Sequence, residues 1–272
     1  MIEAEQGIPR EILALFGLKE SPKAIEGGQG RSLMAGGYVF KHGVDPQEAI
    51  WLAEEVARVP QNGFRLPTPL RALDGRWTVE GWSAWSWIAG THHRKNLSAT
   101  LGAGRAFHHA LAALPRPTWR DKMVDPWTMG DRIAWGEVPL DLDPRILALC
   151  EPLMRALRLK PGRPGLCHCD LAGNTLLHEG SAPGLIDLCL YWRPPDFALA
   201  VAAVDFLDWY RATPAMVTAE FGGTREAFEH LARAQVYRLA TYQGLGLEEE
   251  DLMSKLQVHE PGVRWVLKEL KS

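Results

Sequence analysis

Two different hydrophobic periods divide the chain. Up to about residue 90, short apolar runs such as 38–41 and 82–90 are separated by glycines and prolines, which is typical of an antiparallel sheet. From Ser98 onward, apolar residues recur at intervals of three and four, which predicts helices. The pattern therefore predicts an α+β protein with two lobes, a small antiparallel-sheet lobe at 1–90 and a larger, mainly helical lobe at 91–272, joined by a hinge near 86–90.

Capping and turn residues mark the expected elements of the first lobe. Asp45 and Pro46 suit the N-cap and the first position of a helix that should continue to about Val59. The Asp74-Gly75 pair predicts a hairpin between strands at 69–73 and 77–80.

The second lobe has periodic apolar segments long enough for helices. We expect these at 98–114, 144–157, 197–210, 225–242 and 261–270. The acidic run Glu248–Asp251 precedes the last of them. It predicts a solvated helix start, with attraction of a cationic substrate as the alternative.

Within the helical lobe, one stretch has the pattern of strands. Apolar residues at 166–169 lead into a polar loop that contains Asp170 and Asn174, and a Gly/Pro turn then connects two further apolar runs that end at Asp187. The turn predicts a hairpin, which brings these three polar residues to one rim of a small sheet. Two carboxylates and an amide at such a rim suit general-base chemistry beside a hard cation with oxygen ligands.

The composition excludes several classes of protein. A formal net charge of -3 gives no basic surface for nucleic acid or for an anionic membrane, and no apolar run approaches the length of a transmembrane helix. The first residues lack the pattern of a signal peptide, so we expect a cytoplasmic protein.

The four cysteines are too few and too irregularly spaced for a secreted disulfide scaffold, and reduced thiols are expected. Cys167-His168-Cys169 could contribute to a zinc site. Alternation along a strand, however, points His168 away from both cysteines, and there is no second cysteine pair to complete four ligands. Buried apolar cysteines are the better interpretation.

The central stretch resembles the aminoglycoside phosphotransferase family of kinase-like phosphotransferases. In that family a His-Gly-Asp loop is followed by Asn and, about a dozen residues later, by Ile-Asp. Here His168, Asp170, Asn174 and Asp187 match this order. Two departures are visible: Cys169 replaces the glycine, and Asn174 follows Asp170 by four positions where the protein-kinase loop uses five.

The resemblance extends to the first lobe. A glycine-rich turn containing Gly27, Gly28 and Gly30 could present backbone N–H groups to phosphates, although a plain hairpin turn is the alternative. Lys41 ends the following strand, where the family places its phosphate-binding lysine. The spacing excludes a P-loop.

The resemblance also implies a carboxylate partner for this lysine on the next helix. Glu48 matches best, because the family pattern has a leucine four residues later, here Leu52. Glu54 and Glu55 are the alternatives. Either could equally belong to a solvated helix face.

Two further positions follow from the same resemblance. Ser86 and Ile88 lie in the hinge-like strand that ends at Gly90, and their backbone is expected to receive adenine. The tryptophans of this strand could instead stack on rings of a carbohydrate or nucleic acid, but packing within the protein is commoner. Asp196 matches an acidic residue that braces the catalytic loop.

The resemblance implies transfer of the γ-phosphoryl group of ATP or GTP to a hydroxyl of a small molecule, such as an aminoglycoside, a sugar or an amino alcohol. Asp170 would accept the hydroxyl proton, while Asn174 and Asp187 would hold Mg²⁺. Lys41 and the glycine backbone would hold the triphosphate. His168 would brace the loop by hydrogen bonding.

Two other functions are compatible with the sequence. The shortened loop and Cys169 suggest a catalytically weak or inactive kinase-like protein that binds nucleotide and acts through a partner. A metal-dependent hydrolase using Asp170, Asp187 and His168 would leave Lys41 without a role. The acceptor is not readable from the sequence, because a fold does not determine a function.

Overall fold

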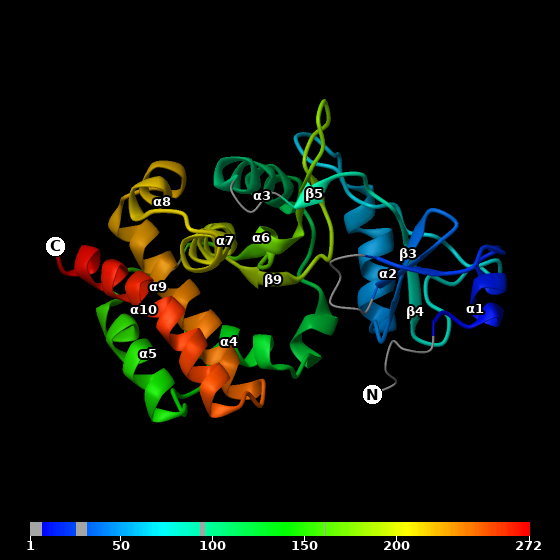
Figure 1. The fold of residues 1–272 in the computed structure, drawn as a ribbon. Coiled ribbons are helices and arrows are strands. Elements are labelled where there is room, and N and C mark those ends of the chain that lie inside the picture. The colour runs from blue at the N-terminus through cyan, green and yellow to red at the C-terminus, as the bar shows by residue number, and fades with distance from the viewer. Residues whose placement is uncertain (1–6, 26–31, 93–95, 161) are drawn as a thin grey trace.

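The structure is a computed structural model that describes residues 7–25, 32–92, 96–160 and 162–272. Its N-terminal lobe is built on a four-stranded antiparallel sheet in the order β1-β2-β3-β4, with α1 at the end of the molecule farthest from the helical lobe (Figure 1). The elements of this lobe are β1 (Lys23–Ala24), β2 (Ser32–Ala35), β3 (Tyr38–His42), β4 (Trp82–Ser86), α1 (Arg10–Leu15) and α2 (Pro46–Glu54).

The sheet buries one face against α1. Phe40 of β3 is fully buried and pairs in register with Ala84 of β4, and its ring meets that of Phe16 edge to face at 5.3 Å. The predicted start of α2 is confirmed, because the Asp45 carboxylate accepts the backbone N–H groups of Gln47 and Glu48. A 3₁₀ turn, η2 (Val56–Arg58), follows α2.

The hairpin predicted around Asp74-Gly75 is wrong. The segment lies along β4 as a loop that makes only isolated bridges, from Pro69 to Trp85 and from Val79 to Trp82. The Asp74 carboxylate accepts the backbone N–H and the guanidinium of Arg76 and so closes a local turn. Prolines before it lack the N–H donors that a strand ladder needs.

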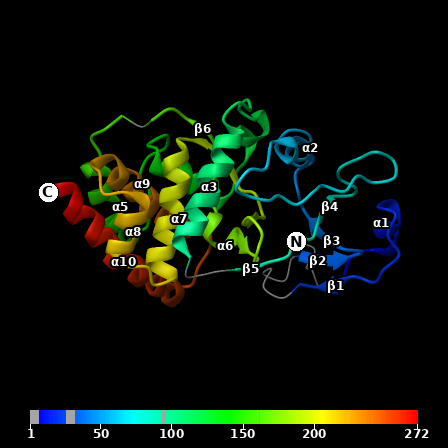
Figure 2. The ribbon, with the colours of Figure 1, turned by 90° about the horizontal axis from the view of Figure 1, so that it is seen from above.

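The helical lobe is arranged around α7 (Pro195–Trp209), which is buried continuously from Phe197 to Phe206. Figure 2 shows α3 running beside α7, with α9 on its other side. The other helices are α3 (Leu97–Leu111), α4 (Pro126–Ala134), α5 (Pro144–Ala156), α8 (Pro214–Phe221), α9 (Arg225–Thr241) and α10 (Glu249–Lys271), together with the 3₁₀ turns η3 (Thr118–Lys122) and η4 (Tyr242–Gly244).

The helices predicted at 197–210 and 225–242 are confirmed by α7 and α9. The last helix was predicted too short, because α10 begins at Glu249 and continues through Pro261. Its acidic first turn complements the positive end of the helix dipole, which supports the interpretation of that run as a helix start.

Two small sheets position the polar stretch of the second lobe. The predicted hairpin is confirmed: β7 (Thr175–Leu177) pairs with β8 (Gly184–Leu185), and β5 (Thr91–His92) joins the other edge of β7. β6 (Gly165–His168) pairs with β9 (Leu190–Arg193). A one-turn helix, α6 (Leu171–Asn174), stands where the sequence predicted a loop.

The larger hydrophobic core is shared between the lobes. Leu52, Val56 and Phe64 from the N-terminal segment belong to the same buried cluster as the helical lobe, and the Phe64 ring packs against Phe107 of α3 at 5.2 Å. A smaller cluster under the sheet contains Phe40 and the α1 residues. Among the described residues, no helix combines the length and apolar character needed to cross a membrane.

Candidate active site

The candidate catalytic loop lies between β6 and α6. Strand β6 is buried and held against β9, so the chain emerges at Asp170 in a fixed position. The backbone of Asp170 then turns directly into α6, which places Asn174 one helical turn later. A single helical turn thus connects Asp170 to Asn174.

His168 holds this loop from beneath. Its Nδ1 accepts the backbone N–H of Asp170 at 3.3 Å and that of Cys189 at 3.2 Å. The ring is completely buried, and this burial lowers the pKa of His168 to about 4, so the ring is neutral at pH 7. The backbone N–H of His168 is in turn accepted by Nε2 of the buried His108 on α3.

The Asp170 carboxylate has a donor on each oxygen. Asn174 donates from Nδ2 to Oδ2 at 2.7 Å, and Arg238 of α9 donates to Oδ1 at 3.1 Å. The side chain remains 44% exposed, so a substrate hydroxyl can reach it. Each carboxylate oxygen retains a lone pair beyond the bond it already accepts.

Asn174 and Asp187 are brought together by the backbone. The Asn174 carbonyl accepts the N–H of Ile186 at 3.0 Å, which places Asp187 beside α6. Both donor bonds of the Asn174 amide go to Asp170, and its Oδ1 remains as an oxygen ligand. Asp187 has a left-handed φ of 50° and a side chain that is 46% exposed. A carboxylate and an amide oxygen form a donor set that suits Mg²⁺.

Lys41 reaches this pair from the other lobe. Its ammonium forms a direct ion pair with Asp187, and its side chain is 31% exposed. Burial lowers the pKa of Lys41 to about 8, and the nearby charge of Glu48 opposes this lowering. The ion pair with Asp187 likewise favours the charged form of the lysine.

Glu48 faces Lys41 without forming a direct ion pair with it. Burial raises the pKa of Glu48 to about 7, while the charges of Arg120 and Lys41 lower it. Of the two alternatives, Glu54 accepts from Trp77 and lies 3.6 Å from Arg71, and Glu55 is exposed. Of the three glutamates, Glu48 is thus the one whose charge acts on Lys41. The direct ion pair of Lys41, however, is with Asp187.

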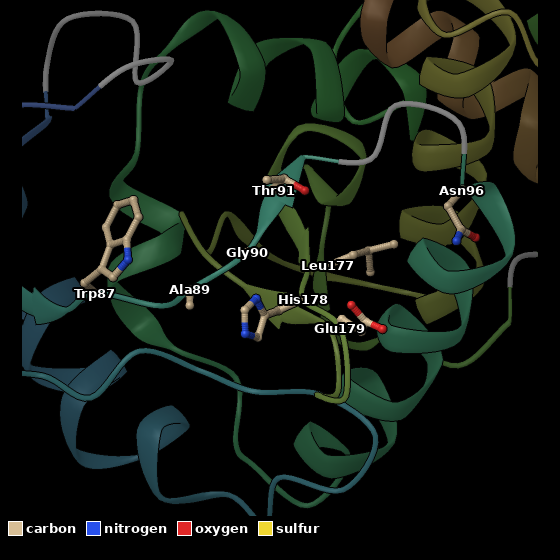
Figure 3. Close-up of a pocket in the computed structure, with 8 residues that line it drawn as sticks. All are labelled: Trp87, Ala89, Gly90, Thr91, Asn96, Leu177, His178 and Glu179. Atoms are coloured by element: carbon tan, nitrogen blue, oxygen red, sulfur yellow. The ribbon is translucent and has the colours of Figure 1, made fainter.

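The hinge positions lie where β4 leaves the sheet. Ser86 exchanges hydrogen bonds with Thr68, whereas the main-chain groups of Ile88 bond to none of the residues that the structure describes. A hollow of about 640 Å³ opens next to this segment (Figure 3). It is lined by Trp87, Ala89, Gly90, Thr91, Asn96, Leu177, His178 and Glu179. Of the described residues, neither Lys41 nor those of the candidate catalytic loop line it.

Several sequence predictions have other outcomes. Gly27, Gly28 and Gly30 lie outside the described residues. Asp196 does not brace the loop: it is exposed at the start of α7, and its charge acts on His230. Among the described residues, no group of three His, Cys, Asp or Glu side chains could hold a metal ion, which leaves the zinc interpretation without support.

Sequence reasoning missed two charged residues beneath Asp170. Arg238 pairs with Asp205 of α7, and both are largely buried. Burial alone lowers the pKa of Arg238, but Asp205, Tyr237 and Asp170 raise it well above its ordinary value, so the guanidinium is charged. A signal was present, because Asp205 interrupts the apolar run 197–206.

A second arginine was also missed. The guanidinium of Arg120 on η3 lies over the Tyr191 ring at 3.7 Å. Burial raises the pKa of the nearby Cys189 thiol to about 12, and the charges of Asp170, Arg120, Glu48 and Arg238 all act on it. Charged residues from both lobes thus act on Cys189, next to β9.

Several solved structures with a similar fold are kinases and phosphotransferases. A thermostable mutant of the aminoglycoside phosphotransferase APH(4)-Ia, in a ternary complex with AMP-PNP and hygromycin B, has a TM-score of 0.59 at 14% identity, covering 96% of this chain and 98% of that chain. A microcompartment-associated aminopropanol kinase has a TM-score of 0.61 at 13% identity, covering 96% of each chain. The choline kinase LicA from Streptococcus pneumoniae has 0.57 at 10%, covering 94% and 97%.

These likenesses define the class: the chain has the kinase-like fold, with a small sheet lobe and a larger helical lobe. A search of curated proteins gave no match. The model of the phosphotransferase enzyme family matches residues 38–251, and the chain belongs to this family, which includes the aminoglycoside phosphotransferases.

Proposed function

We propose that the protein transfers the γ-phosphoryl group of ATP or GTP to a hydroxyl of a small molecule. The observation that carries this proposal is the convergence of Lys41, Asp187, Asn174 and Asp170 from both lobes into one connected set of contacts. Membership of the phosphotransferase family supports the reaction class. The acceptor class extends over aminoglycosides, sugars and amino alcohols.

Each residue has a role that its contacts support. Asp170, partly exposed and held at both oxygens, orients the acceptor hydroxyl and accepts its proton. Lys41 leaves Asp187 and holds the phosphates of the nucleotide. The unbonded backbone of Ile88 is suited to receive the base of the nucleotide. His168, neutral and buried, keeps the loop in place.

Asn174 and Asp187 would hold Mg²⁺ through Oδ1 and the carboxylate. The bound cation would neutralise charge on the phosphate oxygens during transfer. The protein's part is to keep these two oxygen ligands beside Asp170. Hydrogen bonds to Asp170 hold Asn174, and the bond from Ile186 N–H to the Asn174 carbonyl holds the backbone next to Asp187.

The alternative of an inactive kinase-like protein started from the shortened loop and Cys169. The one-turn helix α6 restores the contact between Asn174 and Asp170, and the buried Cys169 occupies the glycine position without touching that contact. A hydrolase using His168 as a ligand is not supported, because that ring is completely buried.

The first experiment is isothermal calorimetry of Mg²⁺-dependent ATP and GTP binding. Asp187→Ala is expected to weaken nucleotide binding at least about tenfold, because a charged ligand group is lost. The matched control is Asp141→Ala, since that carboxylate is exposed in the loop between α4 and α5. Equal affinity in wild type and Asp187→Ala would contradict the metal assignment.

Phosphate transfer to a panel of hydroxyl acceptors then separates enzyme from binding protein. Asp170→Asn is expected to lower kcat by roughly 10²–10⁴ while nucleotide binding stays, because the base is lost but the phosphate contacts remain. Nucleotide binding without transfer to any acceptor would favour the inactive alternative.

A further inference from the structure

A buried charge cluster lies directly beneath the proposed base. Arg238 of α9 donates to Asp205 of α7 from Nε at 2.8 Å and from Nη2 at 2.5 Å. The same Nη2 donates to Asp170 at 3.1 Å. The side chains of Arg238 and Asp205 are only 13% and 9% exposed, so the cluster is part of the protein interior and ends at the surface in Asp170.

We propose that Arg238 is a positioning residue for the phosphoryl transfer: it fixes the Asp170 carboxylate by holding Oδ1 while Asn174 holds Oδ2. The inference rests on the proposed function, in which Asp170 accepts the proton of the acceptor hydroxyl. Nothing in the spacing of the sequence connects Arg238 to the catalytic loop.

The geometry distinguishes this role from that of a simple ion pair. The guanidinium is locked by a two-point contact through Nε and Nη2 to Asp205, and the second hydrogen of Nη2 is the one directed at Asp170. A planar, rigid fork can do this, because its donors point in fixed directions. A lysine in the same place carries the charge but has no such fork.

Asp205 in this arrangement acts on Arg238 and not on the substrate. Burial raises the pKa of Asp205, and the charge and hydrogen bonds of Arg238 lower it. Asp205 of α7 holds Arg238 of α9, and Arg238 in turn holds Asp170 of the loop. The packing of two core helices therefore determines the orientation of the proposed base. Such fixed orientation matters because a displacement of about 1 Å at a reacting group can cost roughly 10²-fold in rate.

The test is the Arg238→Lys variant, which keeps the buried charge opposite Asp205. We expect kcat to fall about 10–100-fold with an unchanged KM for the nucleotide, because only the orientation of Asp170 is lost. The control is Arg225→Lys, near the start of the same helix, because Arg225 pairs with the buried Glu229 and not with the catalytic loop. It should lose stability without losing kcat.

Making Arg238→Lys both in the wild type and in an Asp170→Asn protein separates a structural role of Arg238 from a positioning role. In an Asp170→Asn protein, Arg238→Lys should lower the residual rate no further, since its partner in catalysis is already gone. An Arg238→Lys protein with wild-type kcat, or an equal loss in both backgrounds, would overturn the proposal.

A readout that needs no activity keeps the inference separate from the proposed function. In crystal structures, Asp170 should occupy one rotamer in the wild type and more than one in Arg238→Lys and in Asp205→Asn. An unchanged single rotamer in both variants would overturn the positioning role. Absence of transfer by the wild type, with the rotamer change present, would overturn the proposed function alone.

Discussion

Lys41 and Glu48 are partly buried between the lobes, and burial acts on their pKa values in opposite directions. It lowers the pKa of Lys41 to about 8 and raises that of Glu48 to about 7. Both pKa values thus lie closer to physiological pH than those of the same side chains on the surface. The pH dependence of the protein should therefore report on this pair.

Glu48→Gln should change how stability depends on pH. Because the pKa of Glu48 in the folded protein lies above its value of 4.5 in the unfolded chain, the folded state binds more protons between these values. The free energy of unfolding contributed by Glu48 therefore falls as pH rises from about 4.5 to 7, by up to about 3 kcal/mol, and the glutamine variant escapes this loss.

The measurement is denaturant unfolding of both proteins at pH 5 and pH 8. From pH 5 to pH 8, the wild type should lose free energy of unfolding relative to Glu48→Gln. Glu55→Gln serves as the control, because Glu55 is exposed and directly follows α2. Parallel profiles for wild type and Glu48→Gln would contradict the burial of a protonated carboxyl at pH 5.

At the scale of elements, α3 approaches the catalytic loop unusually closely. A Cβ on Gly104 would lie 2.6 Å from Leu171 of α6 and 2.8 Å from Leu199 of α7, both of them buried side chains. Leu171 directly follows Asp170. Close packing at this point therefore supports the position of α6 and of the proposed base that precedes it.

Gly104→Ala should destabilise the protein by about 1–3 kcal/mol, because the two leucines cannot move aside in a packed core. The same substitution at Gly102, where nothing lies within 4 Å, should instead stabilise by about 1 kcal/mol through helix propensity. Chemical denaturation of both variants gives the comparison. A loss at Gly102 matching that at Gly104 would refute the packing argument.

Elements whose residues are neighbours in the chain could be predicted from the sequence. The hairpin of β7 and β8 and the helices α7 and α9 follow from turn residues and apolar periods. The false hairpin at 69–80 shows the limit: Asp74 does close a local turn, but the prolines before it lack the N–H donors that pairing of the flanking strands would need.

Contacts between distant segments could not be predicted in the same way. Arg238 is 68 residues from Asp170, and no spacing indicates which face of α9 meets the loop. The resemblance to a family named Lys41, Asp187 and the loop residues, since these stand in motifs. It could not name Arg238 or Asp205, which depend on how helices pack.

On the scale of the whole molecule, the lobes are joined by more than the chain segment that follows β4. Beyond the shared core around Phe64 and Phe107, the Trp51 ring of α2 meets Trp119 of η3 at 6.3 Å, and Lys122 donates to Gln47 at 3.4 Å. Helix α2, which carries Glu48, is thus packed against the helical lobe as well as beside the sheet.

Thermal unfolding should therefore be one transition for both lobes, because α2 and η2 cannot lose their environment without opening the larger core. Differential scanning calorimetry checks this through equal calorimetric and van't Hoff enthalpies. Two resolved transitions would contradict it. The matched variant Phe64→Ala should lower the free energy of unfolding by about 3–5 kcal/mol. The whole transition should therefore move to lower temperature.

The ion pair of Lys41 with Asp187 has a consequence for how ligands are admitted. A lysine that turns to phosphates leaves Asp187 without its counter-charge, and a carboxylate that takes a cation leaves Lys41 free for phosphates. Nucleotide and divalent cation should then each raise the affinity for the other, by one and the same factor, because linkage is reciprocal. A single salt bridge between the lobes would thus make the binding of the two ligands positively cooperative.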